Sequence, residues 1–338
     1  MSRGRAEVTP QGMAKVLLHV LRRLTVATAM VLAVLAMNFV LIHAAPGDPA
    51  QVIAGEMGGA DEATMADIRR TYGLDRPLHV QFGAYLAKCL QLDLGTSYAY
   101  NRPVIELIGE RLWPTVLLVL TALVAAIGLG TVLGVLASRR PDSLGAGVVS
   151  VLSLVGYSMP VFWTGILLVL TFGKLWPVLP IAGMRDVRAL GAGGWAGAMD
   201  VARHLVLPAS TLAIVYLAQY SRLSRASMLE VLGSDYIRTA RAKGLSDAAV
   251  VFKHALRNAL MPIVTMAGLQ FGNLISGALL VETVFSWPGL GTLALDAILG
   301  RDVPTLLGVL TFSAILVVVA NIVTDASYRW IDPRLRTR

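Results

Sequence analysis

The stretch "SDYIRTARAKGLSDAAVVFKHALRNALMP", residues 234–262, combines charge with helical periodicity. It carries five basic and two acidic residues. Its apolar residues nevertheless recur at spacings of three and four, which is typical of an amphipathic helix. Basic and apolar side chains arranged in this way can bind an acidic partner or the surface of an anionic membrane. The stretch therefore predicts a binding element: two short helices that offer a polar side to a partner.

Glycine, serine and proline divide this stretch into two helices. Gly244 interrupts the pattern, and a residue without Cβ permits a tight corner. Ser246 is a suitable N-cap for the second helix, with Asp247 in its first turn, and Pro262 suits the first turn of the next helix. The expected apolar stripes are Leu229, Leu232, Tyr236 and Ala240 before the corner, and Leu245, Ala248, Ala249, Phe252, Leu256 and Leu260 after it.

Two other interpretations of the charged stretch must be weighed. A solvated linker has no reason to extend over residues 222–259, because connections between helices usually take about 2–8 residues. An amphipathic element that lies on the bilayer surface would account for the apolar faces, and this alternative stays open.

A second group of polar residues lies in an apolar run after the charged stretch. Polar and ionisable residues inside a membrane commonly mark a transport path. The candidates for a substrate pathway are Gln270, Asn273, Ser276 and Glu282. Glu282 ends its run, so it could also simply reach water; the hypothesis is that it gates or supports the outer mouth.

The sequence offers no catalytic or metal-binding constellation. The five histidines are scattered without ligand spacing, so no metal site is expected. The only Gly-Lys pair, Gly173-Lys174, precedes Leu175 and Trp176 and so lacks the pattern of a phosphate-binding loop. Ser158 lacks the flanking glycines of a nucleophile elbow, which argues against an intramembrane hydrolase. We expect no catalytic residue and no cofactor in this chain.

The composition indicates an all-α integral membrane protein. The chain of 338 residues is 56% hydrophobic and only 15% charged, whereas soluble domains are about 25% charged. Six runs without Asp, Glu, Lys or Arg are long enough to cross a bilayer, which takes about 18 residues or more. The predicted transmembrane helices are residues 24–45, 112–138, 143–173, 204–224, 260–282 and 303–327.

The distribution of basic residues predicts the orientation. With both termini in the cytoplasm, 18 Lys and Arg lie inside and 11 outside, as the positive-inside rule requires. The basic balance is thus explained by topology and membrane lipid, not by nucleic acid. The cytoplasmic segments are then 1–23, 225–259 and 328–338, and the extracytoplasmic segments are 46–111, 174–203 and 283–302.

Glycine and proline patterns predict two features of the spans. The Gly130-x-x-x-Gly134 spacing permits close helix packing. Pro160 should kink the third span, either as an ordinary kink or as a hinge; an ordinary kink is the simpler interpretation. In the outer segment 46–111 we expect two short helices, within residues 61–74 and 77–95.

The charged stretch also carries a family resemblance. "DYIRTARAKGL" (235–245) with "HALRNALMP" (254–262) resembles the EAA loop of permease subunits in ABC importers, in the form of the dipeptide/oligopeptide/nickel branch. Arg238-Thr239-Ala240 stands where the general motif has Glu-Ala-Ala, and the motif's final proline is missing. Other matching pieces are "PGDP" (46–49), "YGLDRPLHVQFGAYL" (72–86), "LDLGTS" (92–97), "LWPTV" (112–116), "VETVFSWPGLG" (281–291) and "DPRLR" (332–336).

The resemblance implies a type I ABC importer permease fold with cytoplasmic coupling helices. It implies half of a translocation pathway in a bacterial inner membrane, completed by a second homologous permease subunit. Two cytoplasmic ATPase subunits would bind ATP and Mg²⁺, and an extracytoplasmic substrate-binding protein would deliver the solute. The residues implied to couple to the ATPases are Asp235, Tyr236, Arg238, Thr239, Ala240, Lys243, Gly244 and Leu245.

The substrate and the transporter class leave alternatives open. Oligopeptides or dipeptides are the expected solutes, but this branch also handles nickel complexes, glutathione and saccharides. A stand-alone secondary transporter would usually place ionisable residues at mid-membrane and show repeated halves, and the sequence shows neither. A scaffold or receptor subunit would share the fold and the loop, so only transport data distinguish it.

Overall fold

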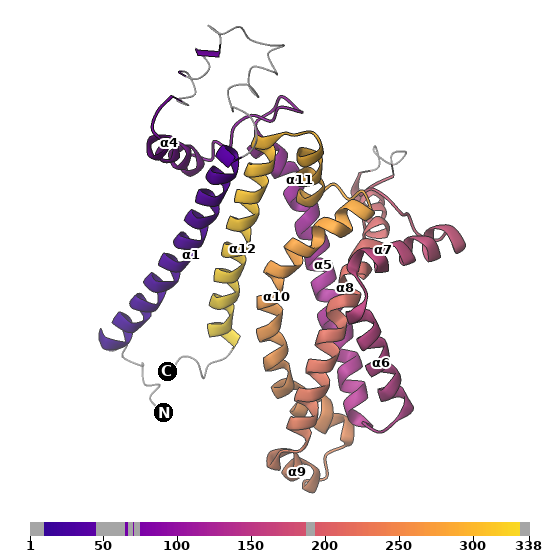
Figure 1. Ribbon diagram of the computed structural model, residues 1–338. Coiled ribbons are helices and arrows are strands. Elements are labelled where there is room, and N and C mark those ends of the chain that lie inside the picture. The colour runs from indigo at the N-terminus through magenta and orange to yellow at the C-terminus, as the bar shows by residue number, and fades with distance from the viewer. Residues whose placement is uncertain (1–9, 45–64, 67–69, 71–74, 187–192, 332–338) are drawn as a thin grey trace. The chain divides into compact units, whose positions relative to one another are not determined.

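The computed structural model describes residues 10–44, 65–66, 70, 75–186 and 193–331. These residues form helices joined by short connections (Figure 1). They contain no β-strand, only an isolated bridge between Thr96 and Pro103, which agrees with the predicted all-α class. The chain divides into two compact units, Met1–Ile105 with Arg301–Ile322 and Glu106–Gly300 with Val323–Arg338.

The first unit contains α1 (Pro10–Ala44), α4 (Leu78–Leu90) and the first part of α12 (Val303–Ile331). Asn38 on α1 is fully buried, and its Nδ2 donates a hydrogen bond to Thr311 Oγ1 on α12 at 2.9 Å. Phe39 on α1 packs edge-on against Phe82 on α4, with ring centroids 5.2 Å apart. Polar and aromatic contacts thus join α1 to its two neighbours.

Helix α4 corresponds to the second predicted outer helix but ends sooner than expected. Leu92 adopts a left-handed φ of 59°, and the backbone N of Asp93 returns to the carbonyl of Lys88 at 3.0 Å. This six-to-one bond closes the helix end in the usual way. The other predicted outer helix, residues 61–74, lies almost entirely outside the described residues.

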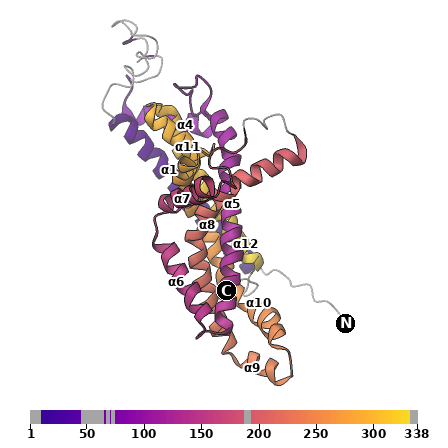
Figure 2. The same cartoon turned by 90° about the vertical axis from the view of Figure 1, so that its right-hand side faces the viewer.

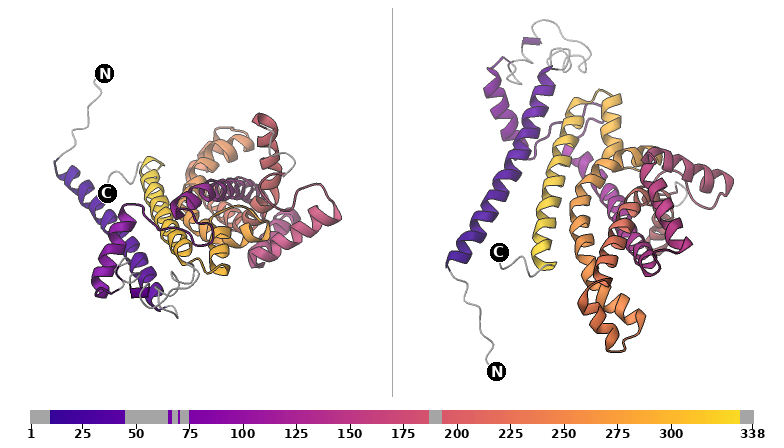
Figure 3. Two further views of the ribbon diagram at one scale, coloured as in Figure 1. Left: turned by 90° about the horizontal axis from the view of Figure 1, so that it is seen from above. Right: turned by 60° about the horizontal axis from the view of Figure 1, so that its bottom comes forward.

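The second unit is built around three long helices: α5 (Val104–Arg139), α8 (Gly194–Leu232) and α10 (Leu256–Val284). Helix α8 lies beside both α6 and α10, as Figures 1 and 3 show. The remaining elements are α6 (Leu144–Ser158), α7 (Val161–Val169), α9 (Asp235–Ala242), α11 (Leu290–Leu299) and two π-helices, η1 (Leu170–Leu175) and η3 (Ala249–Ala255).

The glycine pair of α5 packs directly against α8. A Cβ on Gly130 would lie 2.9 Å from the carbonyl oxygen of Leu217, and one on Gly134 would lie 2.5 Å from that of Ser221. Both distances are shorter than any tolerable contact. Ser224 Oγ adds a hydrogen bond to the Thr131 carbonyl across the same contact, at 3.1 Å. The predicted close packing at this spacing is confirmed.

The third predicted span is bent far more than by an ordinary proline kink. Helices α6 and α7 with η1 meet at 107° (Figure 2). Met159 and Pro160 both have extended backbone, with ψ of 134° and 137°. The proline ring drives the residue before it out of the helical region, so the helix stops at Ser158 and a new one starts at Val161. The simpler expectation, one kinked helix, is wrong.

Within the described residues, each of the six predicted spans overlaps helical segments. Only some of these helices are also long and apolar enough to count as candidate membrane spans. Within the described residues, three helices are long and apolar enough to cross a membrane: Val104–Arg139, Gly194–Leu232 and Val303–Ile322. The bent pair makes a fourth if it counts as one span. The six-span topology therefore stays a prediction. Pro262 lies inside α10 and not in its first turn, because η3 runs directly into α10 and the helix begins earlier than expected.

Candidate functional site

Helix α9 is held to the rest of the second unit by its inner face. It follows α8 after a turn at Gly233 and Ser234. Ile237 is fully buried and Ala240 is 8% exposed. They pack into a cluster drawn from four other helices, whose buried members are Val135, Met228, Val250, Val251, Ala255 and Ala259. Of the predicted coupling residues, Ala240 therefore anchors the element.

The opposite face of α9 is open to solvent. Arg238 and Asp235 form an ion pair at 3.5 Å, with side chains 81% and 94% exposed; such a pair contributes little to stability. Tyr236 is 42% exposed and its hydroxyl accepts a hydrogen bond from Asn258 Nδ2 at 2.7 Å. The exposed residues, named here the α9 outer surface, are Asp235, Tyr236, Arg238, Thr239, Lys243, Gly244 and Leu245.

Gly244 forms the predicted corner. Its φ of +78° is a left-handed conformation that disfavours any residue with a Cβ. Its backbone N donates to the Arg241 carbonyl at 2.9 Å, which closes the end of α9. Ser246 then caps the next helix, accepting a bond from Ala249 N at 3.4 Å. Helix, glycine corner and capped helix thus stand as the sequence predicts.

The apolar stripe after the corner differs from the expected one. Phe252 is 50% exposed and Leu245 is 41% exposed, whereas Val250 and Val251 are buried. The cause is η3, because a π-helix takes more residues per turn than an α-helix and shifts the inward-facing positions. On α9, the expected stripe placed Tyr236 inside, whereas the structure buries its neighbour Ile237.

The start of the second loop helix is tied to the end of α5. Arg139 Nη2 and Asp247 Oδ2 lie 2.9 Å apart. Both side chains are partly exposed, 39% and 59%, so the pair is weak in energy. It nevertheless connects the segment between α9 and η3 with the turn that joins α5 to α6.

The four predicted pathway residues all lie on α10. Gln270 is 8% exposed, and its side chain forms a hydrogen bond with Tyr216 on α8. Asn273 and Ser276 lie in a part of α10 whose side chains are outside the described residues. Glu282 is fully buried. The structure thus places Gln270 and Glu282 inside the second unit, and the pathway itself remains a prediction.

The Glu282 carboxyl group closes the start of α11. Oε2 accepts hydrogen bonds from the backbone N of Gly291 at 2.7 Å and of Thr292 at 3.3 Å. The first backbone N–H groups of a helix have no partner within it, so a carboxyl group there satisfies them. A Cβ on Gly289 would overlap the same carboxyl group. The glycines of "PGLG" therefore leave room for Glu282.

Residues outside the predicted pathway set complete this contact. Thr115 Oγ1 on α5 donates to Glu282 Oε1 at 2.6 Å. The indole N–H of buried Trp287 donates to the carbonyl of Pro114 at 2.9 Å. Both segments, "LWPTV" and "VETVFSWPGLG", carry the family resemblance, but nothing in a single sequence shows that they touch.

In the first unit, Asp302 organises the loop before α5. This residue is 1% exposed. Its Oδ2 accepts hydrogen bonds from Ser97 Oγ at 2.5 Å and Thr305 Oγ1 at 2.7 Å. Burial alone would raise the pKa of Asp302, but the hydrogen bonds from Ser97, Thr305 and the backbone outweigh it and hold that pKa below its ordinary value of 3.8. A buried carboxylate thus fastens the "LDLGTS" loop to the start of α12.

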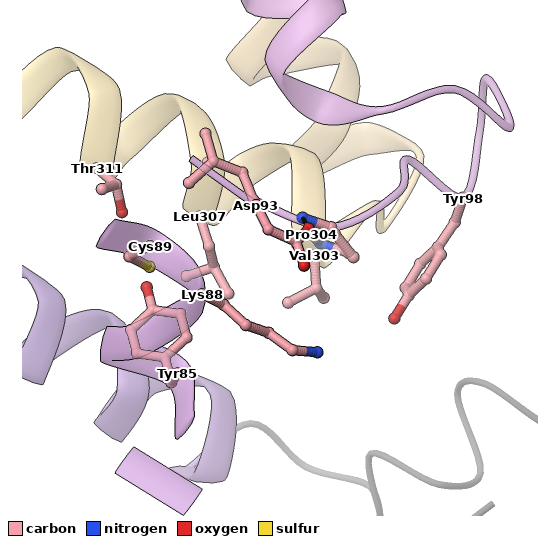
Figure 4. A pocket seen from close by; sticks show the side chains of 12 residues that line it. Tyr85, Lys88, Cys89, Asp93, Tyr98, Val303, Pro304, Leu307 and Thr311 are labelled. Carbon is pink, nitrogen blue, oxygen red and sulfur yellow. Dashed lines mark hydrogen bonds between the residues drawn. The ribbon is translucent and has the colours of Figure 1, made fainter. Parts of the chain in front are cut away.

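A pocket of about 230 Å³ lies beside this loop, between α4 and the first turns of α12 (Figure 4). The side chains of Tyr85, Cys89 and Thr311 lie close together in it, and Lys88 extends away from them. Burial, with the nearby Cys89, raises the pKa of Tyr85 to about 12, although hydrogen bonds to Thr311 and Asn38 oppose the rise. The pocket is mainly apolar with one cationic and one acidic side chain, Lys88 and Asp93. Asp93 Oδ1 already accepts a bond from Gly95 N at 3.1 Å.

Comparison with known proteins agrees with this architecture. Residues 130–337 match the model of the "Binding-protein-dependent transport system inner membrane component" family, and residues 16–119 match the model of its N-terminal part. The chain is 40% identical over 322 residues to the glutathione transport system permease protein GsiC of Salmonella paratyphi A. It is 37% identical over 335 residues to the dipeptide transport system permease protein DppB of Escherichia coli K12. Each alignment covers 94% of this chain and 98% of the relative.

Solved structures support the fold independently. An inward-facing crystal form of the MetNI methionine ABC transporter superposes with a TM-score of 0.52 at 18% identity, covering 67% of this chain and 96% of that one. The expected permease fold is thereby confirmed. The family description and the relatives confirm that this chain is an inner membrane component and the membrane subunit, not the ATPase. The chain belongs to the family of inner membrane components of binding-protein-dependent transport systems, the permease subunits of ABC importers.

Proposed function

We propose that this chain forms half of the pathway of an ATP-driven peptide importer and that an ATPase subunit docks on the α9 outer surface. The observation that carries the proposal is the two-sided construction of α9. Its inner face is fixed by buried Ile237, while Tyr236 and the charged residues beside it stay exposed. A buried anchor with an open polar face suits transient docking of a soluble partner.

The loop that contains α9 and η3 could transmit a movement of α9 to the membrane helix α10. Residues of α9, η3 and α10 share one buried cluster. Helix α10 begins at Leu256, directly after η3 ends at Ala255, so no flexible connection separates docking element and membrane helix. Movement of α9 by an ATPase would therefore carry α10 with it, because packed elements move as rigid bodies.

The complete assembly would contain other chains. The proposal includes a second homologous permease, two ATPase subunits that hold ATP and Mg²⁺, and a substrate-binding protein at the outer segments. In this proposal both termini and the coupling loop lie in the cytoplasm. The concentration of basic residues in these segments supports that orientation. Lipid surrounds the spans, and no nucleic acid takes part.

The solute would be a small peptide. In support, the relatives named above are a glutathione permease and a dipeptide permease, and a probable peptide ABC transporter permease of Sinorhizobium fredii is 40% identical over 318 residues. Glutathione is itself a tripeptide, so the two substrates share a backbone of amide bonds. Uptake of a labelled dipeptide, challenged with unlabelled glutathione or dipeptide, distinguishes them.

Glu282 would support the pathway without lining it. Its two carboxyl oxygens are already engaged with Thr115 and the start of α11. Gln270, Asn273 and Ser276 remain the candidates for contact with the solute.

The test compares two glycines of the same loop. Gly244→Arg places a side chain on the α9 outer surface at a left-handed φ, whereas Gly233→Arg has an ordinary φ of −80° and a Cβ no closer than 3.5 Å to its neighbours. The tagged chain is purified from native membranes in mild detergent, and the eluate is assayed for ATP hydrolysis. Gly244→Arg should remain in the membrane and lose the ATPase subunits; Gly233→Arg should keep them. Normal ATPase recovery and transport with Gly244→Arg would refute docking at α9.

A further inference from the structure

A second pocket lies in the second unit, at the turn between α5 and α6. Its volume is about 380 Å³, within the range of about 300–1,000 Å³ that is usual for ligand sites. The wall is apolar and comes from both helices, and two arginines stand at its rim. The lining residues are Leu133, Leu136, Ala137, Arg139, Arg140, Ser143, Gly145, Ala146 and Val149.

The turn that forms this rim is rigid. Ser143 Oγ donates to the Arg140 carbonyl at 2.7 Å and accepts from Ala146 N at 3.2 Å, so it caps α6. Arg225 on α8 reaches across and donates to the Pro141 carbonyl at 3.1 Å and to Ser150 Oγ at 2.7 Å. The backbone that carries Arg139 and Arg140 is thus held in place before any ligand arrives, which lowers the entropy lost on binding.

The charges at the rim favour an anion. Among the described residues, Arg140 is exposed and has no ion pair, and Arg139 has only its exposed contact with Asp247. Asp142 lies in the same turn but does not line the pocket. The pocket opens beside the start of α6, whose dipole also favours negative charge.

The apolar wall decides between a free anion and a lipid. A free phosphate ion would make no favourable contact with the apolar side chains of Leu133, Leu136 and Val149. Neighbouring side chains outside the pocket are also apolar and exposed: Leu144 is 91% exposed, Val148 is 56% and Leu152 is 64%. Basic pockets between membrane helices on the cytoplasmic side are known to hold anionic headgroups. A ligand with both an anionic group and an acyl chain matches rim and wall together.

We propose that this pocket binds an anionic phospholipid, with its phosphodiester at Arg139 and Arg140 and its acyl chain against Leu133, Leu136 and Val149. Arg139 also forms an ion pair with Asp247, at the start of the second helix of the predicted coupling loop. The same guanidinium group would therefore contact both the lipid phosphate and this loop. The bound lipid is therefore placed to influence the loop. The assignment of this lipid to the cytoplasmic leaflet rests on the proposed topology. The pocket and its two arginines do not depend on that topology.

The experiment uses the full-length chain in nanodiscs of phosphatidylcholine that contain a photoactivatable phosphatidylglycerol, without ATPase subunits. Crosslinked peptides are mapped by mass spectrometry. Labelling should concentrate in residues 133–149 and fall about fivefold in Arg140→Gln, as expected for one basic residue near an anionic headgroup. Arg257→Gln, which removes an exposed arginine outside the pocket, should label like the parent chain.

A steric pair makes the test independent of charge. A Cβ on Gly145 meets nothing closer than Ser143 Oγ at 3.9 Å, and one on Gly147 meets nothing within 4 Å. Gly145 lines the pocket and Gly147 does not. Gly145→Phe should therefore abolish labelling, whereas Gly147→Phe, on the same helix and equally exposed, should leave it intact.

Three outcomes overturn the proposal. Equal labelling by photoactivatable phosphatidylcholine means ordinary boundary lipid. Full competition by inorganic phosphate means a free-anion site. Retained labelling in both Arg140→Gln and Gly145→Phe means that the pocket is not the site. Since no ATPase is present, each of these results leaves α9 docking untouched, and loss of docking in Gly244→Arg leaves lipid labelling untouched.

Discussion

Thr115 and Glu282, far apart in the sequence, share a hydrogen bond of 2.6 Å inside the second unit. The Thr115 hydroxyl also accepts a bond from Leu290 N at 2.8 Å. One side chain on α5 thereby joins the end of α10 to the beginning of α11. All of these groups are buried, where an unmade hydrogen bond costs about 1–3 kcal/mol. The arrangement fixes α11 to the two longer helices.

Replacing the carboxyl group should loosen this junction. Glu282→Gln replaces one of the two acceptor oxygens with an NH2 donor, which faces either the Thr115 hydroxyl or the backbone N–H groups of Gly291 and Thr292. We therefore expect a loss of about 1–3 kcal/mol in unfolding free energy. The thermal unfolding midpoint in detergent and protease cleavage near residues 285–289 report the effect. Asp296→Asn, an exposed carboxyl on α11 itself, is the control. Transport unchanged in Glu282→Gln would reject the supporting role.

The coupling between the two residues can be measured directly. Thr115→Val removes the hydroxyl at constant shape, and the double variant Thr115→Val/Glu282→Gln completes a cycle. We expect the effects on unfolding free energy to be clearly less than additive, because both changes break the same contact. Strict additivity would show that the two side chains contribute independently.

The neighbours Ile237 and Tyr236 should separate stability from docking. Ile237→Ala opens a cavity in a fully buried cluster, and such truncations cost about 2–5 kcal/mol. Tyr236→Ala removes a side chain that is 42% exposed, so the unfolding midpoint should change little while ATPase recovery falls. The two assays are run on both variants. A Tyr236→Ala chain that retains its full ATPase complement would remove this residue from the docking surface.

Two glycines of α5 should respond oppositely to alanine. Gly134→Ala drives a methyl group into the α8 backbone and should destabilise by about 1–3 kcal/mol. A Cβ on Gly128 meets nothing within 4 Å, so Gly128→Ala should be neutral or stabilising by up to about 1 kcal/mol through helix propensity. Thermal unfolding of the two variants in the same detergent makes the comparison, and equal midpoints would contradict the close packing of α5 on α8.

Asp302 should give the first unit an acid-sensitive contact. Its pKa is lowered in the folded chain, so the carboxylate stabilises the fold above the ordinary Asp pKa, and this contribution is lost as pH falls through the folded pKa. The difference in unfolding midpoint between the parent chain and Asp302→Asn should be constant near neutral pH and shrink below about pH 4. Asp75→Asn, an exposed control in the same unit, should show no such trend. A difference that grows on acidification would contradict the sign.

The helical character, the glycine corner and the family could be predicted from sequence because each rests on local patterns. The free energy of transferring a charge-free run into lipid depends only on the residues of that run. The left-handed backbone conformation at Gly244 likewise depends on that residue having no Cβ. The Gly130 and Gly134 spacing likewise describes one face of one helix. The residues around Asp235 and Arg238 were assigned to coupling through the family resemblance of the same local stretch, and that role stays a prediction.

Other features were decided only by tertiary structure. Val250 and Val251 are buried because η3 is a π-helix, and no propensity in the sequence foretells that wider turn. The sequence predicts only a kink at Pro160, whereas the break into two helices at 107° depends on how α6 and α7 pack against α8. Glu282 is recognisable as an acidic residue at the end of a span; its burial requires Thr115 and the start of α11.

The physical reason is the range of the interactions. Backbone conformation and transfer into lipid are properties of neighbouring residues, so the sequence by itself determined helices, corners and membrane runs. Hydrogen bonds between distant side chains, the arginine-rimmed pocket between α5 and α6 and the buried face of α9 exist only when separate helices meet. Only the tertiary structure brings those helices together.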